Sequence, residues 1–149
     1  MVRALLNGTK SQTRRKIKSA VDELGERAPA CPYGGPGDRL WVKETWRRDP
    51  VNGAERVIYR ATPEHESLGP WKSALFMPRA ASRILLEIEA TRIERLQDIS
   101  NEDALAEGIP RVASGESPQY LYRKIWEAIN GTGSWESNPL VWVLEFRSV

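Results

Sequence analysis

The alternation of apolar and polar side chains over residues 82–96 constrains the fold of this chain more than any other feature of its sequence. Apolar side chains occupy every second position of its central part: Ile84, Leu86, Ile88 and Ala90. Charged residues such as Glu87 and Glu89 lie between them. Since successive side chains of a strand point to opposite faces, the segment predicts a long, half-buried strand, bent near Ala90. A half-buried strand needs partner strands beside it.

Three other segments carry strand patterns and can supply these partners: 39–46, 55–61 and 140–149. The turn sequence 49–53 lies between the first two. The stretch 25–38 holds four glycines and three prolines and is predicted to be a surface loop. We expect residues 62–80 to be irregular and the polar stretch 10–18 to begin as a loop.

Helix signals flank these strands. A short helix is predicted over 2–7, ending at Asn7-Gly8. Ser100 and Asp103 have the spacing of a capping box, which opens a second helix that stops at Gly108. Ser117-Pro118 opens a third helix, because a serine cap followed by proline is typical of a first turn. We expect its apolar side to consist of Leu121, Ile125, Ala128 and Ile129.

Together these elements predict an α+β chain that forms one domain over 1–149. Strands that enclose two helical insertions fit a small mixed β-barrel with peripheral helices. Periodicity alone does not separate such a barrel from an open α+β sheet.

Composition excludes several classes of protein. The chain is 40% hydrophobic but has no run of 18 apolar residues, so we expect no membrane-spanning helix. Its first ten residues have too short an apolar stretch for a secretory signal, which predicts a cytoplasmic protein. One cysteine, Cys31, and one histidine, His65, make a disulfide impossible within the chain and a zinc cluster very unfavourable. We expect Cys31 to be a plain loop thiol, His65 to lie on the surface, and no metal or cofactor to be needed.

The charge is unevenly distributed, although the net charge is only +2. Residues 1–18 contain no acid and six cations: Arg3, Lys10, Arg14, Arg15, Lys16 and Lys18. Of the 22 lysines and arginines, 16 therefore remain in 19–149, where 20 acids give a net charge of −4. With six tryptophans in the chain, this basic segment suits phosphates and nucleobases, although the same residues also serve ordinary packing.

Lys10 and Thr13 are the first candidates for chemistry. Their spacing would bring the ammonium beside the hydroxyl in a helical turn, and the neighbouring cations would lower the pKa of the lysine. A lysine tuned in this way can act as a general base, with the threonine as nucleophile or orienting group. Glu107, at the end of the second helix, can hold that lysine or shuttle a proton. The alternative is a solvated basic loop with Glu107 facing water.

A second group of candidates could bind substrate or phosphate: Arg14, Arg15, Arg79, Arg83 and Trp41. Arg79 and Arg83 precede the long strand, where guanidinium groups can reach a cleft at the rim of the sheet. An ion pair with an acid on a strand is the structural alternative. Trp41 is a candidate stacking surface for a base, and its alternative is packing.

Taken in order, several segments resemble the ASCH domain family of the PUA-like superfamily of RNA-associated barrels, and the phage and prophage branch in particular. The segments that carry the resemblance are the pattern Gly8, Lys10, Thr13, Arg15; the loop 31–38; the strand 39–46; Met77-Pro78-Arg79; and the segments 94–100 and 138–143. The resemblance covers nearly the whole chain.

The resemblance implies a PUA-like barrel and an activity. Small bacterial members hydrolyse the acetyl amide of N(4)-acetylcytidine with a lysine, a threonine and a glutamate, which match Lys10, Thr13 and Glu107. Other members are ribonucleases or are proposed to bind RNA, so an RNA-binding module or weak ribonuclease is the alternative. A phage accessory protein with a role in assembly ranks last, because the sequence has no helical heptads and no large apolar tail. The expected partner is a modified nucleoside or single-stranded RNA, in a phage- or prophage-encoded monomer or dimer of the bacterial cytoplasm.

The chain departs from this branch in two places. Its relatives usually carry an extra strand before the segment that begins at Met1, so the barrel is expected to lack its usual first strand. An exposed sheet edge would then remain. Ala80 also stands where a tryptophan is expected after Met77-Pro78-Arg79, which would change how a base is stacked.

Overall fold

The computed structural model describes residues 1–17, 30–51, 54–62, 69–113 and 115–149 and has an α+β architecture. Its helices and strands, in chain order, are α1 (Val2–Leu6), β1 (Gln12–Lys16), β2 (Arg39–Trp41), β3 (Trp46–Val51), β4 (Ala54–Tyr59), β5 (Leu85–Arg95), α2 (Asn101–Ala106), α3 (Pro118–Asn130) and β6 (Leu140–Ser148). Short 3-10 turns lie at Ala74–Phe76, Arg79–Ala81 and Leu96–Asp98.

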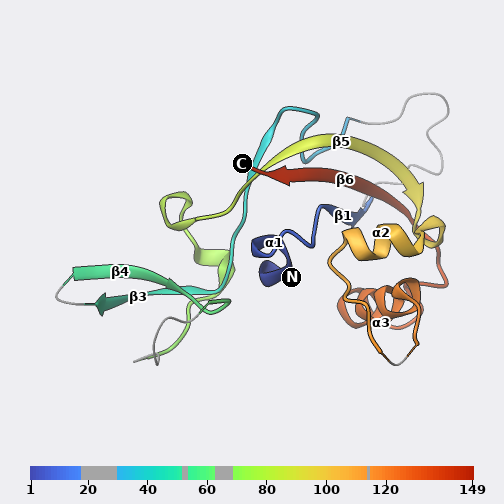
Figure 1. The fold of residues 1–149 in the computed structure, drawn as a ribbon. Helices are drawn as coiled ribbons and strands as arrows, with labels where there is room; N and C mark the ends of the chain where they lie inside the picture. Colours follow the sequence, from blue (N-terminus) through green and yellow to red (C-terminus); the bar gives the residue numbers. More distant parts are fainter. Residues whose placement is uncertain (18–29, 52–53, 63–68, 114) are drawn as a thin grey trace.

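Four strands form a curved sheet in the order β1-β6-β5-β2 (Figure 1). Every strand pair among the described residues is antiparallel, so the expected mixed sheet is not observed in this part of the chain. The sheet ends at β1 on one side and at β2 on the other. It is therefore a curled, open sheet. Residues of α1 and of the two edge strands β1 and β2 line one hollow on the inner side of this sheet.

The predicted long strand is confirmed as β5, the longest strand described. The register between β5 and β6 shifts between Ile88 and Ala90, which places a bulge at the expected bend. A bulge increases local twist and bends the strand, so β5 curves over the sheet as Figure 1 shows.

Strand β6 is buried on both faces and divides the core. Val141 and Val143 pack against α2 and α3, in a cluster that includes Leu96, Tyr122 and Trp126. Residues of the opposite parity turn to the other face of the sheet, where Trp142 and Leu144 pack with Ile88. On that same face, α1 inserts Leu5 against Phe146 and β5. A strand covered on both faces explains why 140–146 is almost continuously apolar.

The segment 39–46 was expected to be one strand, and this expectation is wrong. Only Arg39–Trp41 pairs with β5, and Trp46 already belongs to β3 in a separate two-stranded sheet with β4. Residues 49–51, expected in a turn, continue β3. The β3–β4 hairpin extends away from the main sheet in Figure 1, because residues 42–45 carry the chain from one sheet to the other.

The predicted helices are present, but the buried side of α3 is not the expected one. Both predicted serine caps form, and Asp103 completes the capping box at Ser100. In α3, however, Tyr122 and Trp126 are the buried residues, whereas Ile125, Ala128 and Ile129 are exposed. The larger aromatic side chains take the core positions, which leaves an aliphatic stripe facing outward.

No helix in the described part of the chain is long and apolar enough to span a membrane.

Candidate functional site

Lys10 and Glu107 are brought together by the backbone. An isolated antiparallel bridge pairs the two residues, and the N–H of Ser11 donates to the carbonyl of Ala106 at 2.8 Å. The ammonium nitrogen Nζ of Lys10 then donates to Oε2 of Glu107 at 2.7 Å and to the carbonyl oxygens of Glu107 and Gln12 at 2.8 and 2.7 Å. The side chains are 3% and 4% exposed. All three protons of the ammonium group therefore have acceptors in a buried site.

The end of α2 fixes the position of Glu107. The capping box of Ser100 and Asp103 starts this six-residue helix, and Glu107 is its C-cap. Gly108 follows with a φ of +88°, a left-handed conformation that favours glycine and turns the chain away. The carboxylate is buried against Lys10, so the alternative of a solvent-facing Glu107 is wrong.

Burial lowers the pKa of Lys10 below its usual 10.5, which favours the neutral amine. The carboxylate of Glu107 acts in the opposite direction and raises it, through charge and a hydrogen bond. Arg15 and Arg14 add smaller lowering effects. The net direction is downward, so this lysine holds its proton less tightly than a lysine in water.

Thr13 does not lie in a helical turn with Lys10, as its spacing suggested, because Gln12–Lys16 is strand β1. In this strand Thr13 pairs with Leu144 and Arg15 with Trp142, while Arg14 pairs with Val143. Paired residues in an antiparallel sheet point to the same side. Thr13 and Arg15 therefore face the hollow that α1 lines, and Arg14 faces α2 and α3.

Arg14 is committed to carboxylates. Its side chain is wholly buried, and Nη2 lies 3.0 Å from Glu94 Oε2 and 3.1 Å from Asp103 Oδ2. Nη1 lies 3.8 Å from Oε1 of Glu107 and donates to the side chain of Gln12. Arg14 thus faces the Glu107 carboxylate, whose other oxygen is bound by Lys10, and its guanidinium holds protein carboxylates instead of lying free for a phosphate.

The cleft beside these residues has two adjoining halves that share Met1, Thr13, Arg15 and Tyr33. The half we call the α3 half has a volume of about 270 Å³ and is lined by Glu107, Tyr122 and the outer residues of α3. The other, the Trp41 half, has a volume of about 360 Å³ and is lined by Lys10, Trp41 and apolar residues of α1 and the sheet. Thr13 lies where the halves meet, and Lys10 and Glu107 line one half each.

Four buried polar atoms of residues lining the α3 half have no hydrogen-bond partner among the described residues: Thr13 Oγ1, Arg14 Nε, Glu107 Oε1 and Trp126 Nε1. A buried polar group without a partner costs free energy. Because the residues that carry these four atoms all line the α3 half, this half is the candidate position for a polar ligand.

Tyr122 belongs to the same site, and the sequence did not single it out as functional. Burial raises the pKa of its phenol, and the negative charge of Glu107 raises it further. The phenol therefore stays protonated near neutral pH and remains a potential hydrogen-bond donor. Its spacing from Trp126 was visible in the sequence, but the same spacing is common in packed helices.

The remaining predicted binding residues divide into two groups. Arg15 is exposed and lines both halves of the cleft, and Trp41 lines its larger half beneath Lys43 Nζ and the Arg79 guanidinium, 5.1 and 5.9 Å from its ring. Arg83 lies apart from the cleft lining. Its Nε and Nη2 donate to the two oxygens of buried Glu44 at 2.9 and 3.0 Å. This is the ion pair stated as the structural alternative, although Glu44 lies in the connection between β2 and β3 and not on a strand.

Cys31 is a free, half-buried thiol that packs against the Trp142 cluster. His65 lies outside the described residues. Within the described part of the chain, no group of three or more histidine, cysteine, aspartate or glutamate residues could hold a metal ion.

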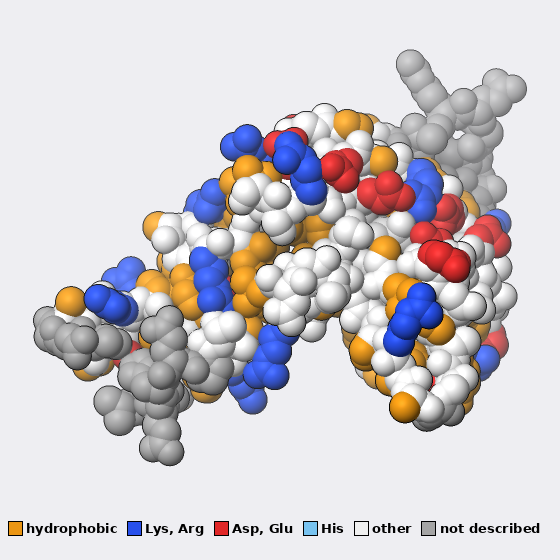
Figure 2. All heavy atoms as spheres, viewed as in Figure 1, with side chains coloured by type: hydrophobic (Ala, Val, Ile, Leu, Met, Phe, Trp, Pro, Cys, Tyr) orange, Lys and Arg blue, Asp and Glu red, His pale blue; other side chains and the backbone are white. Residues whose placement is uncertain are grey.

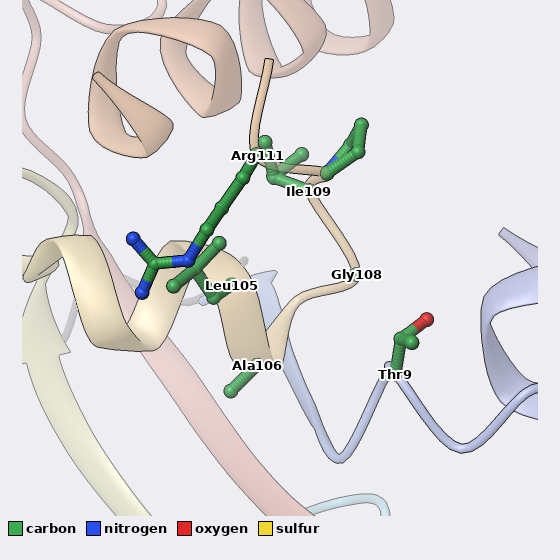
Figure 3. Close-up of a pocket in the computed structure, with 7 residues that line it drawn as sticks. Thr9, Leu105, Ala106, Gly108, Ile109 and Arg111 are labelled. Atoms are coloured by element: carbon green, nitrogen blue, oxygen red, sulfur yellow. The ribbon is translucent and has the colours of Figure 1, made fainter. Parts of the chain in front are cut away.

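The chain also has a larger hollow, of about 490 Å³, between α2, the residues after it and Thr9 (Figure 3). Its walls are Thr9, Leu105, Ala106, Gly108, Ile109, Pro110 and Arg111. Most of this lining is apolar, and the side chain of Thr9 donates to the carbonyl of Ala4 at 3.2 Å. We therefore place the candidate site in the smaller cleft, which contains the buried ion pair and the unpartnered polar atoms.

Comparisons of the chain with protein-family models, with curated proteins and with solved structures find no match. The resemblance to the ASCH domain family therefore stays a prediction from the sequence.

Proposed function

We propose that the cleft hydrolyses the exocyclic amide of an acylated nucleoside such as N(4)-acetylcytidine. The observation that carries this proposal is the buried hydroxyl of Thr13, which has no hydrogen-bond partner among the described residues. Thr13 lines both halves of the cleft, one with Lys10 and the other with Glu107, and these two residues form a buried ion pair. A hydroxyl that shares a concave site with a buried acid–base pair is an arrangement that suits acyl transfer.

The reaction consumes one water. Thr13 Oγ attacks the amide carbon. Because this hydroxyl has no hydrogen-bond partner among the described residues, its proton passes through a bridging water to the Lys10–Glu107 pair. The C–N bond then breaks as the nucleoside amine takes a proton from that pair. Water then hydrolyses the threonine ester, which releases a carboxylic acid and restores the hydroxyl. In an alternative version of the mechanism, Thr13 does not attack but orients the water, and the water attacks the amide carbon directly. Both versions give the same products.

The hydrogen bonds define where the transferred proton can go. Nζ of Lys10 donates three hydrogen bonds, so Lys10 accepts a proton only after it has lost one and released a carbonyl acceptor. Its lowered pKa favours this loss. Oε1 of Glu107 has no hydrogen bond among the described residues, and its nearest cation is Nη1 of Arg14 at 3.8 Å, so this oxygen has a free position for a hydrogen bond. Lys10 is the base predicted from the sequence, and we propose Glu107 Oε1 as a second atom that can receive the transferred proton.

Burial of two charges supports a functional role for the pair. Moving both groups out of water costs several kcal/mol each, and apolar side chains of similar size often stabilise a protein equally well. An ionisable group whose pKa is shifted by burial in a cleft is a candidate active-site residue, and burial lowers the pKa of Lys10. Arg15, which is exposed and lies on the same face of β1 as Thr13, is the cation that can stabilise the developing oxyanion.

The alternative, an RNA-binding module or weak ribonuclease, depends on the basic segment acting as a phosphate track. Two of its six cations, Lys10 and Arg14, are buried and paired with carboxylates. Figure 2 shows acidic side chains interleaved with cations over the curved sheet and near α2. Arg15, Lys16, Lys43 and Arg79 are exposed cations close to the cleft or to Trp41 and favour this alternative. The curled sheet is compatible with a PUA-like barrel under either proposal.

Release of cytidine from N(4)-acetylcytidine tests the proposal. We expect Lys10→Ala to lower kcat/KM by at least about 100-fold, as removal of a proton-transfer group does. The matched control is Lys124→Ala, because Lys124 also pairs with a glutamate at 2.7 Å but lies at the surface. Equal rates in wild type and Lys10→Ala would contradict the proposal. Retention of single-stranded RNA that falls steeply with salt, without amide hydrolysis, would support the alternative.

A further inference from the structure

The two halves of the cleft differ in chemistry. The Trp41 half is lined by a large aromatic side chain and by apolar residues that include Leu86, Leu144 and Phe146. The α3 half has a polar end at Thr13 and Glu107 and an aliphatic end at Ile125 and Ile129. A substrate whose reacting carbon lies at Thr13 would therefore extend one of its parts into each half.

The aliphatic end of the α3 half is open to water. Ile125 and Ile129 are 44% and 69% exposed. The solvent-facing side of an amphipathic helix normally carries polar side chains instead. Tyr122 and Trp126 already fill the core side of α3, so these isoleucines are not needed for packing. Their side chains gain burial only when something apolar enters the cleft.

The Trp41 half suits a planar ring. Trp41 is half-buried, and Nζ of Lys43 and Cζ of Arg79 lie 5.1 and 5.9 Å from the centroid of its ring. Indole faces stack on nucleobases, and nearby cations can bind the sugar oxygens of a nucleoside. The larger volume, about 360 Å³ against about 270 Å³, also favours this half for the larger part of the substrate.

We propose that the cleft separates the two sides of the scissile amide, with the nucleobase in the Trp41 half and an apolar acyl chain of more than two carbons against Ile125 and Ile129. This inference rests on the proposed amide hydrolysis and adds the class of acyl group and the residues that select it. The bond changes are those given above, so the acyl chain leaves as a fatty or branched carboxylic acid and the base leaves as its free exocyclic amine.

A substrate series tests the assignment. The full chain is assayed with N(4)-acetyl-, propanoyl-, butanoyl- and hexanoylcytidine, and kcat/KM is measured for each. We expect wild-type kcat/KM to rise about threefold for each methylene from acetyl to butanoyl, since each added methylene is removed from water. Ile129→Ala should flatten this rise, so that it lowers kcat/KM more for the butanoyl substrate than for the acetyl substrate. Trp41→Ala should lower kcat/KM for all four substrates by a similar factor.

The control variant is Leu75→Ala. Leu75 is an aliphatic side chain of similar exposure, 71%, that does not belong to the described lining of either half. It should leave the series unchanged. Ile125→Ala is a second test of the same wall, and thermal unfolding of each variant verifies that it folds.

Three results would overturn the assignment. Hydrolysis with no dependence on chain length would exclude an acyl-binding wall and leave amide hydrolysis standing. Equal losses for acetyl and butanoyl substrates in Ile129→Ala would do the same. Failure of the wild-type chain to hydrolyse any of the four substrates would overturn the proposed function and, with it, this assignment.

Discussion

Nζ of Lys10 lies 2.7 Å from Oε2 of Glu107, and the exposed fractions of the two side chains are only 3% and 4%. Removal of one partner leaves a buried charge with poorer compensation, so Lys10→Met should lower the free energy of unfolding by about 3 kcal/mol. The double variant Lys10→Met/Glu107→Leu should recover most of this loss, because no unpaired charge remains. Urea denaturation at pH 7 measures both.

The double variant also separates stability from function. A fold that needs the pair would lose as much stability in the double variant as in the single one. A site that needs the pair would give a folded double variant without amide hydrolysis. We expect the second result, because the charges carry a cost that apolar packing avoids. Recovered stability with retained activity would contradict the role of the pair.

The pKa of Lys10 gives a prediction with a defined sign. Glu107 raises this pKa against the lowering effects of burial, Arg15 and Arg14, so Glu107→Gln should move it further below 10.5. The ε-carbon resonance of Lys10, followed through a pH titration by NMR, measures the shift. An upward shift in Glu107→Gln would show that the carboxylate does not stabilise the ammonium form.

The same lowered pKa affects stability. Between the folded-state value and the usual 10.5, the unfolded chain binds more protons at Lys10 than the folded chain does. The contribution of Lys10 to the free energy of unfolding therefore rises as pH increases through the folded-state pKa, and it levels off above 10.5. Lys10→Met should lack this rise when its urea midpoints are compared with those of wild type across alkaline pH.

Thr13→Val tests the hydroxyl at the junction. Thr13 Oγ1 is buried without a partner, so its replacement by a methyl group of the same shape should leave the free energy of unfolding unchanged or slightly higher. Hydrolysis of N(4)-acetylcytidine should fall by at least about 100-fold, since the attacking or water-orienting group is gone. Thr13→Ser is the matched control and should keep measurable activity. Full activity in Thr13→Val would exclude both roles for the hydroxyl.

The sequence predicted the strand whose apolar and polar side chains alternate and the helices whose first turns are capped by a serine. The long strand, its bend at Ala90 and the capping box at Ser100 and Asp103 are all confirmed, because each depends on local periodicity or on side chains three residues apart. Strand β1 was not predicted. Its sequence, QTRRK, is polar throughout, and its pairing with β6 is a long-range event that no local pattern records.

The sequence predicted several residues of the candidate site but not how their side chains are arranged. Lys10 and Glu107 were proposed as partners, and the structure brings them to 2.7 Å. Arg14 and Arg15 were grouped as binding residues, but strand alternation sends them to opposite faces, one into a carboxylate network and one to the cleft. The exposure of Ile129 was missed, because the aromatic residues of α3 outcompete it for the core.

Arg14 and Arg15 offer a matched pair of substitutions. Arg14→Leu should destabilise the chain by about 3 kcal/mol or more, since Glu94, Asp103 and Glu107 lose a shared, buried cation. Arg15→Leu removes an exposed side chain and should change stability little, while it raises KM for an acylated nucleoside. Thermal unfolding and steady-state kinetics of both variants measure this. Equal destabilisation by the two substitutions would contradict the different roles assigned to the two faces of β1.

Gly108 controls how closely α1 and Lys10 approach the end of α2, and Figure 3 shows it in the chain between Ala106 and Ile109, across from Thr9. A Cβ added there would lie 2.9 Å from the Cβ of Ala4 and 3.2 Å from the Cβ of Lys10, at a φ of +88°. Gly108→Ala should therefore combine backbone strain with a clash that displaces Lys10 from Glu107.

The control for this clash is Gly8→Ala. Gly8 also has a positive φ, of +69°, but no described atom outside its own chain neighbours lies within 4 Å of an added Cβ. Gly8→Ala should cost about 1 kcal/mol from strain alone, and Gly108→Ala should cost more, by urea denaturation. Gly108→Ala should also move the NMR-measured pKa of Lys10 downward, because the lysine loses the carboxylate that raises its pKa. If the two alanine variants lost the same stability and left the Lys10 pKa unchanged, the close approach at Gly108 would not hold the ion pair in place.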